Sequence, residues 1–479
     1  MKKRIREWLQ PLEHLFVIAY LLVGLLAVFA VPIHAVMDDP LHYLRAYEIS
    51  MGKLVPIAKE MPDGEVFVGD YLHQGAFYFE SDTHASSLEG ELGRMFPYFG
   101  FHADPFQLKW NDYPGNWQRE IDCQSEEFYL FQTTAMYAPT NYLPHVIGIV
   151  VARAFTQKSM LVAYTARFMN WLLVGLVLFQ ALKIMPESYK LLAMAVALIP
   201  MNQQQINSLS PDGMMFAVAL LMLSLIMAAR QSGRLSRRRL ALLAVLAIYL
   251  SLTKIVYVPL AALLLLLPGS AFAGAGSRYK YLAAVFAGAA AANLLWLHTA
   301  MGFLSAQSVA WASPEAQKAF MLAHPLHFLK VLLDTYLIDG KNFLWMAMGA
   351  QMGWEHLQIS KTLLAGYGLA LFLAWLRTAQ RGFDWTRWER LGVAVMVLLI
   401  IVLASAAVYV SWTPLQQGHI DGLRGKYFLV LFLPALLAVL PARDFIWLQE
   451  LLPARGIWLL LLLFDILVFG QMAQLVFQE

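Results

Sequence analysis

A chain of 479 residues, of which 59% are hydrophobic and only 14% are charged, departs strongly from the composition of soluble globular proteins. Several apolar stretches approach the roughly 20 residues that a membrane-spanning helix needs, so the composition excludes an ordinary soluble domain. The formal net charge of +3 hides an asymmetry, because residues 34–140 contain 17 Asp and Glu against 6 Lys and Arg. The rest of the chain is correspondingly basic, which we attribute to membrane topology and not to a nucleic-acid partner.

The first apolar stretch, Leu15 to Ile33, follows a basic N-terminus and lacks a clear small-residue cleavage site, so we predict a retained membrane anchor. It leads into the acidic segment from His34 to Thr140, where Pro and Gly separate short helices and strand-like pieces such as Glu65 to Val68. Tyr142 to Phe155 is too short to span a bilayer and is expected at the outer interface. The expected parts are a cytoplasmic N-terminus with the first span (1–33), an extracytoplasmic loop with juxtamembrane helices (34–158) and a multi-span bundle (159–479).

Eight further spans are predicted in the last part of the chain: Met160–Ala181, Leu191–Ile206, Gly213–Ala229, Tyr281–Ala300, Thr362–Leu376, Leu391–Val410, Phe428–Pro441 and Trp458–Phe477. Between them, the apolar pieces Leu240–Leu252 and Ile255–Pro268 form either one overlong helix or a hairpin of half-length helices with Lys254 near its tip. Arg278 and Lys280 favour the hairpin. Arginine-rich loops mark the cytoplasmic side, and the predicted fold is an all-α polytopic membrane protein with about 10–12 transmembrane helices.

Two carboxylates follow the first span. Asp39, which precedes a proline, is predicted to be the N-cap of a helix that ends near Gly52, and Asp38 lies just outside a helix start that favours anions. On this helix His42 and Arg45 are three residues apart and share a face. Ionisable groups at a membrane surface are costly and favour a functional role. The structural alternative is an ion pair that holds the loop down.

Three other polar features flank later spans. Asp212 ends a short turn and either caps the next helix or contributes to a site. Lys254 lies among apolar residues and needs an anion or a carbonyl, for which a lipid phosphate and a neighbouring Asp both qualify. Arg424 and Lys426 lie in a glycine-rich loop that suits phosphate binding, although basic residues beside a span often only extend to the surface. No Walker loop or dinucleotide motif is present, and the histidines lack metal-ligand spacing.

Taken in order, these motifs resemble a large family of bacterial polytopic membrane proteins long catalogued only as a domain of unknown function. That family is similar to the GT-C glycosyltransferases, which take a sugar from a polyprenyl-phosphate carrier outside the cytoplasmic membrane. The resemblance rests on Asp38-Asp39-Pro40-Leu41-His42-Tyr43, Arg45-Ala46-Tyr47, Gly52, Tyr137-Ala138-Pro139, Tyr142-Leu143-Pro144, Ala166-Arg167, Pro200-Met201, Ser208-Leu209-Ser210-Pro211-Asp212, Thr253-Lys254, Gly353-Trp354 and Gly425-Lys426-Tyr427-Phe428.

The chain departs from the family's motifs at two positions. The usual acidic pair is Asp-Glu, where this chain has Asp38-Asp39. The usual Gln-Gly-Arg-Tyr is here Arg424-Gly425-Lys426-Tyr427, so a bidentate arginine is replaced by the point charge of a lysine.

The resemblance implies a GT-C-like fold in which Asp38 accepts the proton of the attacking acceptor hydroxyl, with inversion at the anomeric carbon. Lys254, Arg424 and Lys426 would stabilise the departing lipid phosphate. It also leaves open a divalent metal ion, Mg²⁺ or Mn²⁺, held by Asp38 and Asp39, because some GT-C enzymes use one and others do not. The predicted catalytic residues are Asp38, Asp39 and His42, and the predicted substrate-binding residues are Arg45, Asp212, Lys254, Arg424, Lys426 and Tyr427.

The expected function is therefore a transferase in the bacterial cytoplasmic membrane. It would move a sugar from a polyprenyl-phosphate-linked donor to an extracytoplasmic cell-envelope glycan or lipid. Two alternatives are a transporter or flippase and a polymerase or ligase of lipid-linked saccharides. Transporters often carry interrupted helices in both halves, and here only Leu240 to Pro268 looks interrupted.

Overall fold

The computed structural model describes residues 10–31, 33–34, 36–60, 66–77, 117–303, 311–353, 355, 357–378, 385–440 and 452–477. These residues are mostly helical with little sheet, which confirms the predicted all-α polytopic class. The helices are α2 (Leu12–Ala30), α3 (Asp39–Ser50), α6 (Gln132–Ala135), α7 (Leu143–Arg153), α8 (Ser159–Ile184), α9 (Glu187–Ala197), α10 (Pro200–Ile206), α11 (Asp212–Ser232), α12 (Arg237–Thr253), α13 (Ala275–Ala300), α14 (Pro314–Ala323), α15 (Pro325–Met348), α16 (Lys361–Thr378), α17 (Arg387–Ser411), α18 (Phe432–Ala438) and α20 (Ala454–Phe477). Four shorter 3-10 segments are η2 (Pro139–Tyr142), η3 (Ile255–Leu266), η4 (Gly269–Ala271) and η5 (Gly425–Leu431).

Within the described ranges, α8, α11, α13, α17 and α20 are long and apolar enough to cross a membrane. The apolar helices α2 and η3, and η5 together with α18, are shorter. Helix α11 lies at the centre, since 89% of its apolar window is buried, whereas the corresponding fraction is only 17% in α13 and 28% in α17. The exposed apolar faces of these outer helices are suited to contact with lipid.

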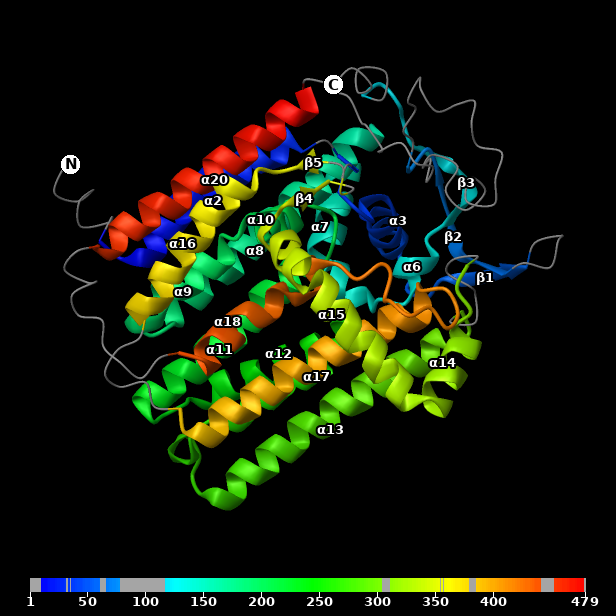
Figure 1. Ribbon diagram of the computed structural model, residues 1–479. Coiled ribbons are helices and arrows are strands. Elements are labelled where there is room, and N and C mark those ends of the chain that lie inside the picture. The colour runs from blue at the N-terminus through cyan, green and yellow to red at the C-terminus, as the bar shows by residue number, and fades with distance from the viewer. Residues whose placement is uncertain are drawn as a thin grey trace, which may run out of the picture.

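The helices run between two ends of the bundle, with the start of α2 at one end and the small sheet at the other (Figure 1). At the first end, Lys190 pairs with Glu13 at 2.8 Å and Arg230 pairs with Glu389 at 2.7 Å. Arg377 and Arg390 donate there to the carbonyl oxygens of residues 452 and 440. We call these two regions the basic end and the sheet end.

The sheet belongs to the acidic segment. Strands β1 (Ile57–Glu60), β2 (Val66–Gln74) and β3 (Asp122–Leu130) form an antiparallel sheet in the order β1-β2-β3. The predicted strand-like piece Glu65 to Val68 falls at the start of β2, although Glu65 itself lies outside the described residues. A second, two-stranded sheet of β4 (Gln351–Met352) and β5 (Leu357–Gln358) follows α15.

Two predicted spans differ from the structure. The expected single span Leu191–Ile206 is two helices, α9 and α10, because the chain bends before Pro200, whose ring disfavours a helical preceding residue. The predicted hairpin is present, since α12 and η3 pack against each other on either side of an extended Lys254. However, α12 has 17 residues and is not half-length.

Sequence reading missed α15. This 24-residue helix lies between the predicted spans Tyr281–Ala300 and Thr362–Leu376, where we predicted no helix. Four charged residues interrupt the apolar sequence of α15, so the segment is too polar to be predicted as a membrane span. Its C-terminal half packs against η5 and fixes the loop that carries Lys426.

Candidate active site

Four breaks in helical structure meet at the sheet end. Asp38 lies between α2 and α3, Asp212 begins α11, Lys254 separates α12 from η3, and Lys426 is the second residue of η5. The Nζ atom of Lys426 lies 3.2 Å from Oδ2 of Asp38, and that of Lys254 lies 2.7 Å from Oδ1 of Asp212. We call these four side chains the four-charge cluster.

Asp38 takes the N-cap position of α3 with a φ of 67°, and its side chain makes no capping hydrogen bond. The carboxylate is therefore free to face Lys426 and remains 38% exposed. Burial opposes its ionisation, but the charges of Lys426 and Lys254 outweigh that effect and hold the pKa of Asp38 below its ordinary value. Asp38 is thus an ionised, partly accessible carboxylate with a cation beside it.

Asp39 does not cap α3, which corrects the prediction from the sequence. The left-handed backbone at Asp38 shifts the cap by one residue and turns Asp39 into the core, where it is fully buried. Its Oδ1 accepts a hydrogen bond from the Leu209 amide at 2.9 Å, and its Oδ2 lies 3.5 Å from Nη2 of Arg167. We call this group the Asp39 anchor. Burial raises the pKa of Asp39 to about 6 despite the Arg167 charge.

Lys254 has the anionic partner that its position demands. Asp212 supplies it and makes no capping hydrogen bond to α11, so the capping interpretation of Asp212 was wrong. The Lys254 ammonium also lies 5.4 Å from the ring centre of Tyr137 and 5.7 Å from that of Tyr427. Aromatic faces attract a cation, so the two rings help to position it.

His42 lies close to the four-charge cluster but is uncharged at neutral pH. Burial lowers the pKa of His42 to about 3. Its Nδ1 is 2.8 Å from the hydroxyl of Tyr142, and its ring stacks on Tyr137. His42 therefore links the tyrosines behind Lys254 to α3, and its catalytic role stays a prediction.

Arg45 is turned away from the four-charge cluster. It is fully buried, pairs with Glu48 and donates to the carbonyl oxygens of Leu54 at 3.0 Å and Tyr137 at 3.3 Å. Glu48 lies one helical turn further on and offers a nearer carboxylate than Asp38 does. Arg45 therefore pairs with Glu48 and not with Asp38, and contact of Arg45 with substrate stays a prediction.

The loop before η5 brings the last predicted residues to the same end. Gly425 packs directly on α15, where an added Cβ atom would lie 2.3 Å from the Ala347 nitrogen, so only glycine fits. Arg424 pairs with Glu355, and the Tyr427 carbonyl accepts a hydrogen bond from Tyr257 at 2.8 Å. This close packing fixes Arg424, Lys426 and Tyr427 relative to the bundle.

The donor set does not suit a divalent metal ion. Among the described residues, no three His, Cys, Asp or Glu side chains are grouped so that they could hold one. Asp38 and Asp39 point to different cations, Lys426 and Arg167, and do not converge. We therefore derive no step through a metal.

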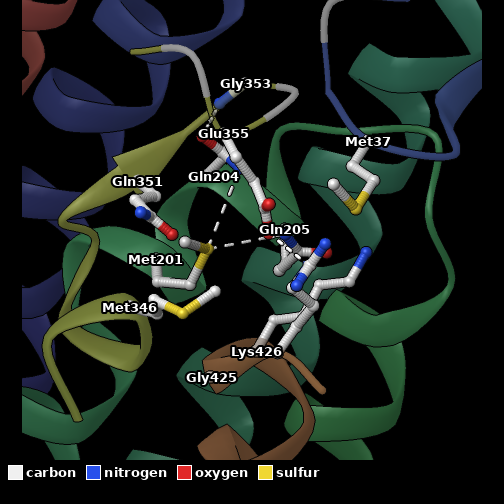
Figure 2. Close-up of a pocket in the computed structure, with 11 residues that line it drawn as sticks. Met37, Met201, Gln204, Gln205, Met346, Gln351, Gly353, Glu355, Gly425 and Lys426 are labelled. Carbon is white, nitrogen blue, oxygen red and sulfur yellow. Dashed lines mark hydrogen bonds and ion pairs between the residues drawn. The ribbon is translucent and has the colours of Figure 1, made fainter. Parts of the chain in front are cut away.

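A polar pocket beside Lys426 was missed from the sequence. Helix α10 is fully buried although it contains Asn202 and three consecutive glutamines, Gln203 to Gln205. This polar run inside a predicted span was the signal that could have revealed it. Figure 2 shows the pocket, which is lined by Met37, Met201, Gln204, Gln205, Met346, Gln351, Gly353, Glu355, Arg424, Gly425 and Lys426.

Comparison with known proteins yields a family and no characterised relative. No curated protein and no solved structure gives a significant match to the chain. A family model described as a predicted membrane protein, DUF2142, matches residues 21–435, a range that includes the four-charge cluster, the Asp39 anchor and the pocket. The chain therefore belongs to the DUF2142 family of predicted membrane proteins.

Proposed function

We propose that this protein is a membrane glycosyltransferase that uses a polyprenyl-phosphate-linked sugar and transfers the sugar to a glycan or lipid of the cell envelope. The four-charge cluster carries the proposal. Two ammonium groups, each beside a carboxylate, lie at one end of an apolar bundle. A donor with a lipid tail and a phosphate requires this combination of a lipid-facing surface and fixed cations.

The distribution of basic residues supports a site outside the cytoplasm. Arg230, Arg377 and Arg390 lie together at the basic end, away from the sheet end. Arginines in short loops stay on the cytoplasmic side during insertion. In a bacterial cytoplasmic membrane, the four-charge cluster would then face outward, where lipid-linked sugars meet envelope acceptors.

The proposed step is a direct displacement. An acceptor hydroxyl oxygen forms a bond to the anomeric carbon while the bond from that carbon to the phosphate oxygen breaks, and the configuration inverts. The hydroxyl proton passes to Asp38, and the electron pair of the broken bond leaves with the polyprenyl phosphate. The phosphate gains one negative charge, which Lys254 and Lys426 are placed to stabilise.

The ion pair between Lys426 and Asp38 couples donor binding to proton transfer. While Lys426 faces Asp38, it keeps the pKa of that carboxyl low and makes Asp38 a weak base. A donor phosphate attracts Lys426 and competes with Asp38 for its charge. Asp38 then becomes a stronger base only when a donor is bound.

One structural observation favours a second candidate, a flippase for lipid-linked saccharides. The α9–α10 break before Pro200 adds a second interrupted segment to the α12–η3 break at Lys254. Interrupted helices often line transport pathways. A flippase would move labelled lipid-linked sugar across liposome membranes without consuming it, whereas a transferase releases polyprenyl phosphate.

The decisive experiment compares envelope glycans of cells with and without the protein, and then supplies their membranes with a panel of undecaprenyl-phosphate monosaccharides. We expect one sugar to disappear from the glycans and the corresponding lipid to be consumed only when the protein is present. A polymerase would be recognised by a ladder of products. Unchanged glycans together with no consumption of any lipid would overturn the proposal.

A further inference from the structure

We propose that the pocket beside Lys426 is a saccharide subsite that holds one sugar ring by its hydroxyl groups. This inference rests on the proposed function and extends it from the lipid phosphate to the sugar. The pocket lies between α10, the β4–β5 hairpin and the loop from Arg424 to Lys426 (Figure 2). None of the residues that we assign to hydroxyl binding was among the candidates from the sequence.

The first supporting observation is an unused buried amide. Gln205 is only 2% exposed and lines the pocket, and its Oε1 has no hydrogen-bond partner among the described residues. Its Nε2 contacts only the Met201 sulfur, at 3.7 Å, which is a weak acceptor. A buried polar group without a partner is costly, so Gln205 is set up to bind a ligand that both donates and accepts hydrogen bonds.

Three neighbouring residues add further polar groups to the pocket lining. The Oε1 atom of Gln204 accepts the Gly353 amide at 3.0 Å, which fixes the hairpin against α10. The Gln351 amide and the Glu355 carboxylate come from the same hairpin and line the pocket. Glutamine and carboxylate oxygens accept from hydroxyl groups, and the glutamine amides donate to them.

Another part of the pocket lining is apolar and fits the C–H face of a sugar ring. Met37, Met201 and Met346 supply flexible apolar surface, which suits the C–H face of a pyranose or furanose ring. The space within the lining, about 320 Å³ with its open side included, is too small for an oligosaccharide.

The pocket adjoins the proposed reaction centre. Lys426 lines the pocket, and its Nζ lies 3.2 Å from the Asp38 carboxylate. Met37 directly precedes Asp38, and its amide donates to the Gly353 carbonyl at 3.3 Å. A ring in the pocket therefore has the lipid-phosphate cations and the base at one side.

The ion pair between Arg424 and Glu355 spans this pocket lining. Glu355 has a φ of 73°, a left-handed conformation that is uncommon for a residue other than glycine. This backbone turns the side chain toward Arg424 and the pocket. A sugar hydroxyl donates to the Glu355 carboxylate while Arg424 stays paired with it.

The test uses the full-length chain in nanodiscs. Binding of undecaprenyl phosphate and of undecaprenyl-phosphate-linked hexose, N-acetylhexosamine and pentose is measured for the wild type, Gln205→Met and the control Gln203→Met. Gln203 is equally buried on the same helix but does not line the pocket. Saturation-transfer NMR with the corresponding methyl glycosides reports binding of a free sugar.

We expect Gln205→Met to weaken binding of at least one sugar-bearing probe by about 10-fold, the effect of losing one or two buried hydrogen bonds. Binding of undecaprenyl phosphate, and every binding property of Gln203→Met, should stay unchanged. A loss confined to the lipid-linked sugars assigns the ring to the donor, and a loss confined to the methyl glycosides assigns it to the acceptor. If Gln205→Met does not fold, Glu355→Gln, which keeps the shape of the side chain, provides the same comparison.

The subsite is overturned if the folded pocket variant binds every sugar-bearing probe as the wild type does, or if the wild type binds no sugar more tightly than its sugar-free counterpart. Failure of the proposed function looks different. In that case membranes that contain the wild type consume no lipid-linked sugar, whatever the pocket variants bind.

Discussion

The four-charge cluster and the Asp39 anchor begin one residue apart in the chain, but their carboxylates differ in exposure and in the groups that hold them. In the cluster, Asp38 is partly exposed and faces a lysine, whose single charge on a flexible stem can turn to another anion. In the anchor, Asp39 is fully buried and is held by a backbone amide and an arginine. Arg167 is fixed further, because it donates to the Val31 carbonyl at 2.6 Å.

This difference shows which of two adjacent carboxylates is available for chemistry. A buried ion pair loses much stability when one partner is removed, so the anchor is expected to serve the fold. A partly exposed carboxylate can be removed at smaller structural cost. The variants below separate the two roles, beginning with the largest expected effect.

Asp38→Asn should lower sugar transfer by about 10²- to 10⁴-fold, since general-base catalysis contributes on this scale. The thermal unfolding midpoint in nanodiscs should remain that of the wild type, because Asp38 caps nothing with its side chain. Transfer is measured as release of polyprenyl phosphate from the active donor. Asp38→Glu serves as the control that keeps the charge, and wild-type transfer by Asp38→Asn would remove Asp38 as the base.

Asp39→Ala should act mainly on stability. It leaves the Arg167 guanidinium and the Leu209 amide buried without their shared partner, which costs about 3–5 kcal/mol. The measurement is the free energy of unfolding, or the shift in unfolding midpoint, in nanodiscs. Glu187→Gln is the matched control, because Glu187 is 71% exposed in its pair with Lys190 and should contribute less than about 1 kcal/mol. Equal effects of the two variants would contradict the anchor role.

The anchor also predicts a pH dependence of stability. Asp39 has a pKa of about 6 in the folded chain and an ordinary value of 3.8, so the folded state holds this proton more tightly. The resulting stability is complete below about pH 4 and is lost as the pH rises through about 6, by up to about 3 kcal/mol. We expect the wild type to lose stability relative to Asp39→Asn over this window. A pH-independent difference between the two unfolding free energies would be evidence against it.

Lys254→Met tests the other half of the four-charge cluster. It removes the ammonium beside Asp212, and we expect about 10-fold weaker binding of undecaprenyl phosphate, because a charged hydrogen bond to phosphate is lost. Lys53→Met, between α3 and β1, is the control, since Lys53 pairs with Glu126 of β3 away from the cluster. Unchanged affinity in Lys254→Met would exclude Lys254 from the phosphate site.

The fold class and the need of Lys254 for an anion could be predicted, because hydropathy and the cost of a buried charge act locally. Which charged side chains pair with each other could not be predicted from the sequence. Asp38 meets Lys426 across 388 residues, and no spacing in the chain encodes that pair. The partner of Arg45 could not be predicted for a related reason, since a face shared with His42 gives no information about the carboxylate of Glu48.

Backbone geometry set the other limit on the prediction. An Asp-Pro start usually makes the Asp the cap, and here the left-handed Asp38 moved the cap by one residue. The same limit hid the pocket, because the bend before Pro200 turned part of a predicted span into a short polar helix.

That polar helix has a consequence for biogenesis. The three glutamines and one asparagine of α10 make the segment a poor substrate for independent insertion from the translocon. The buried Oε1 atom of Gln204 accepts the amide of Gly353, which is synthesised 149 residues later. The central part of the bundle therefore cannot be completed in the order of synthesis. The contact between α10 and the hairpin that follows α15 forms only after α15 has been synthesised.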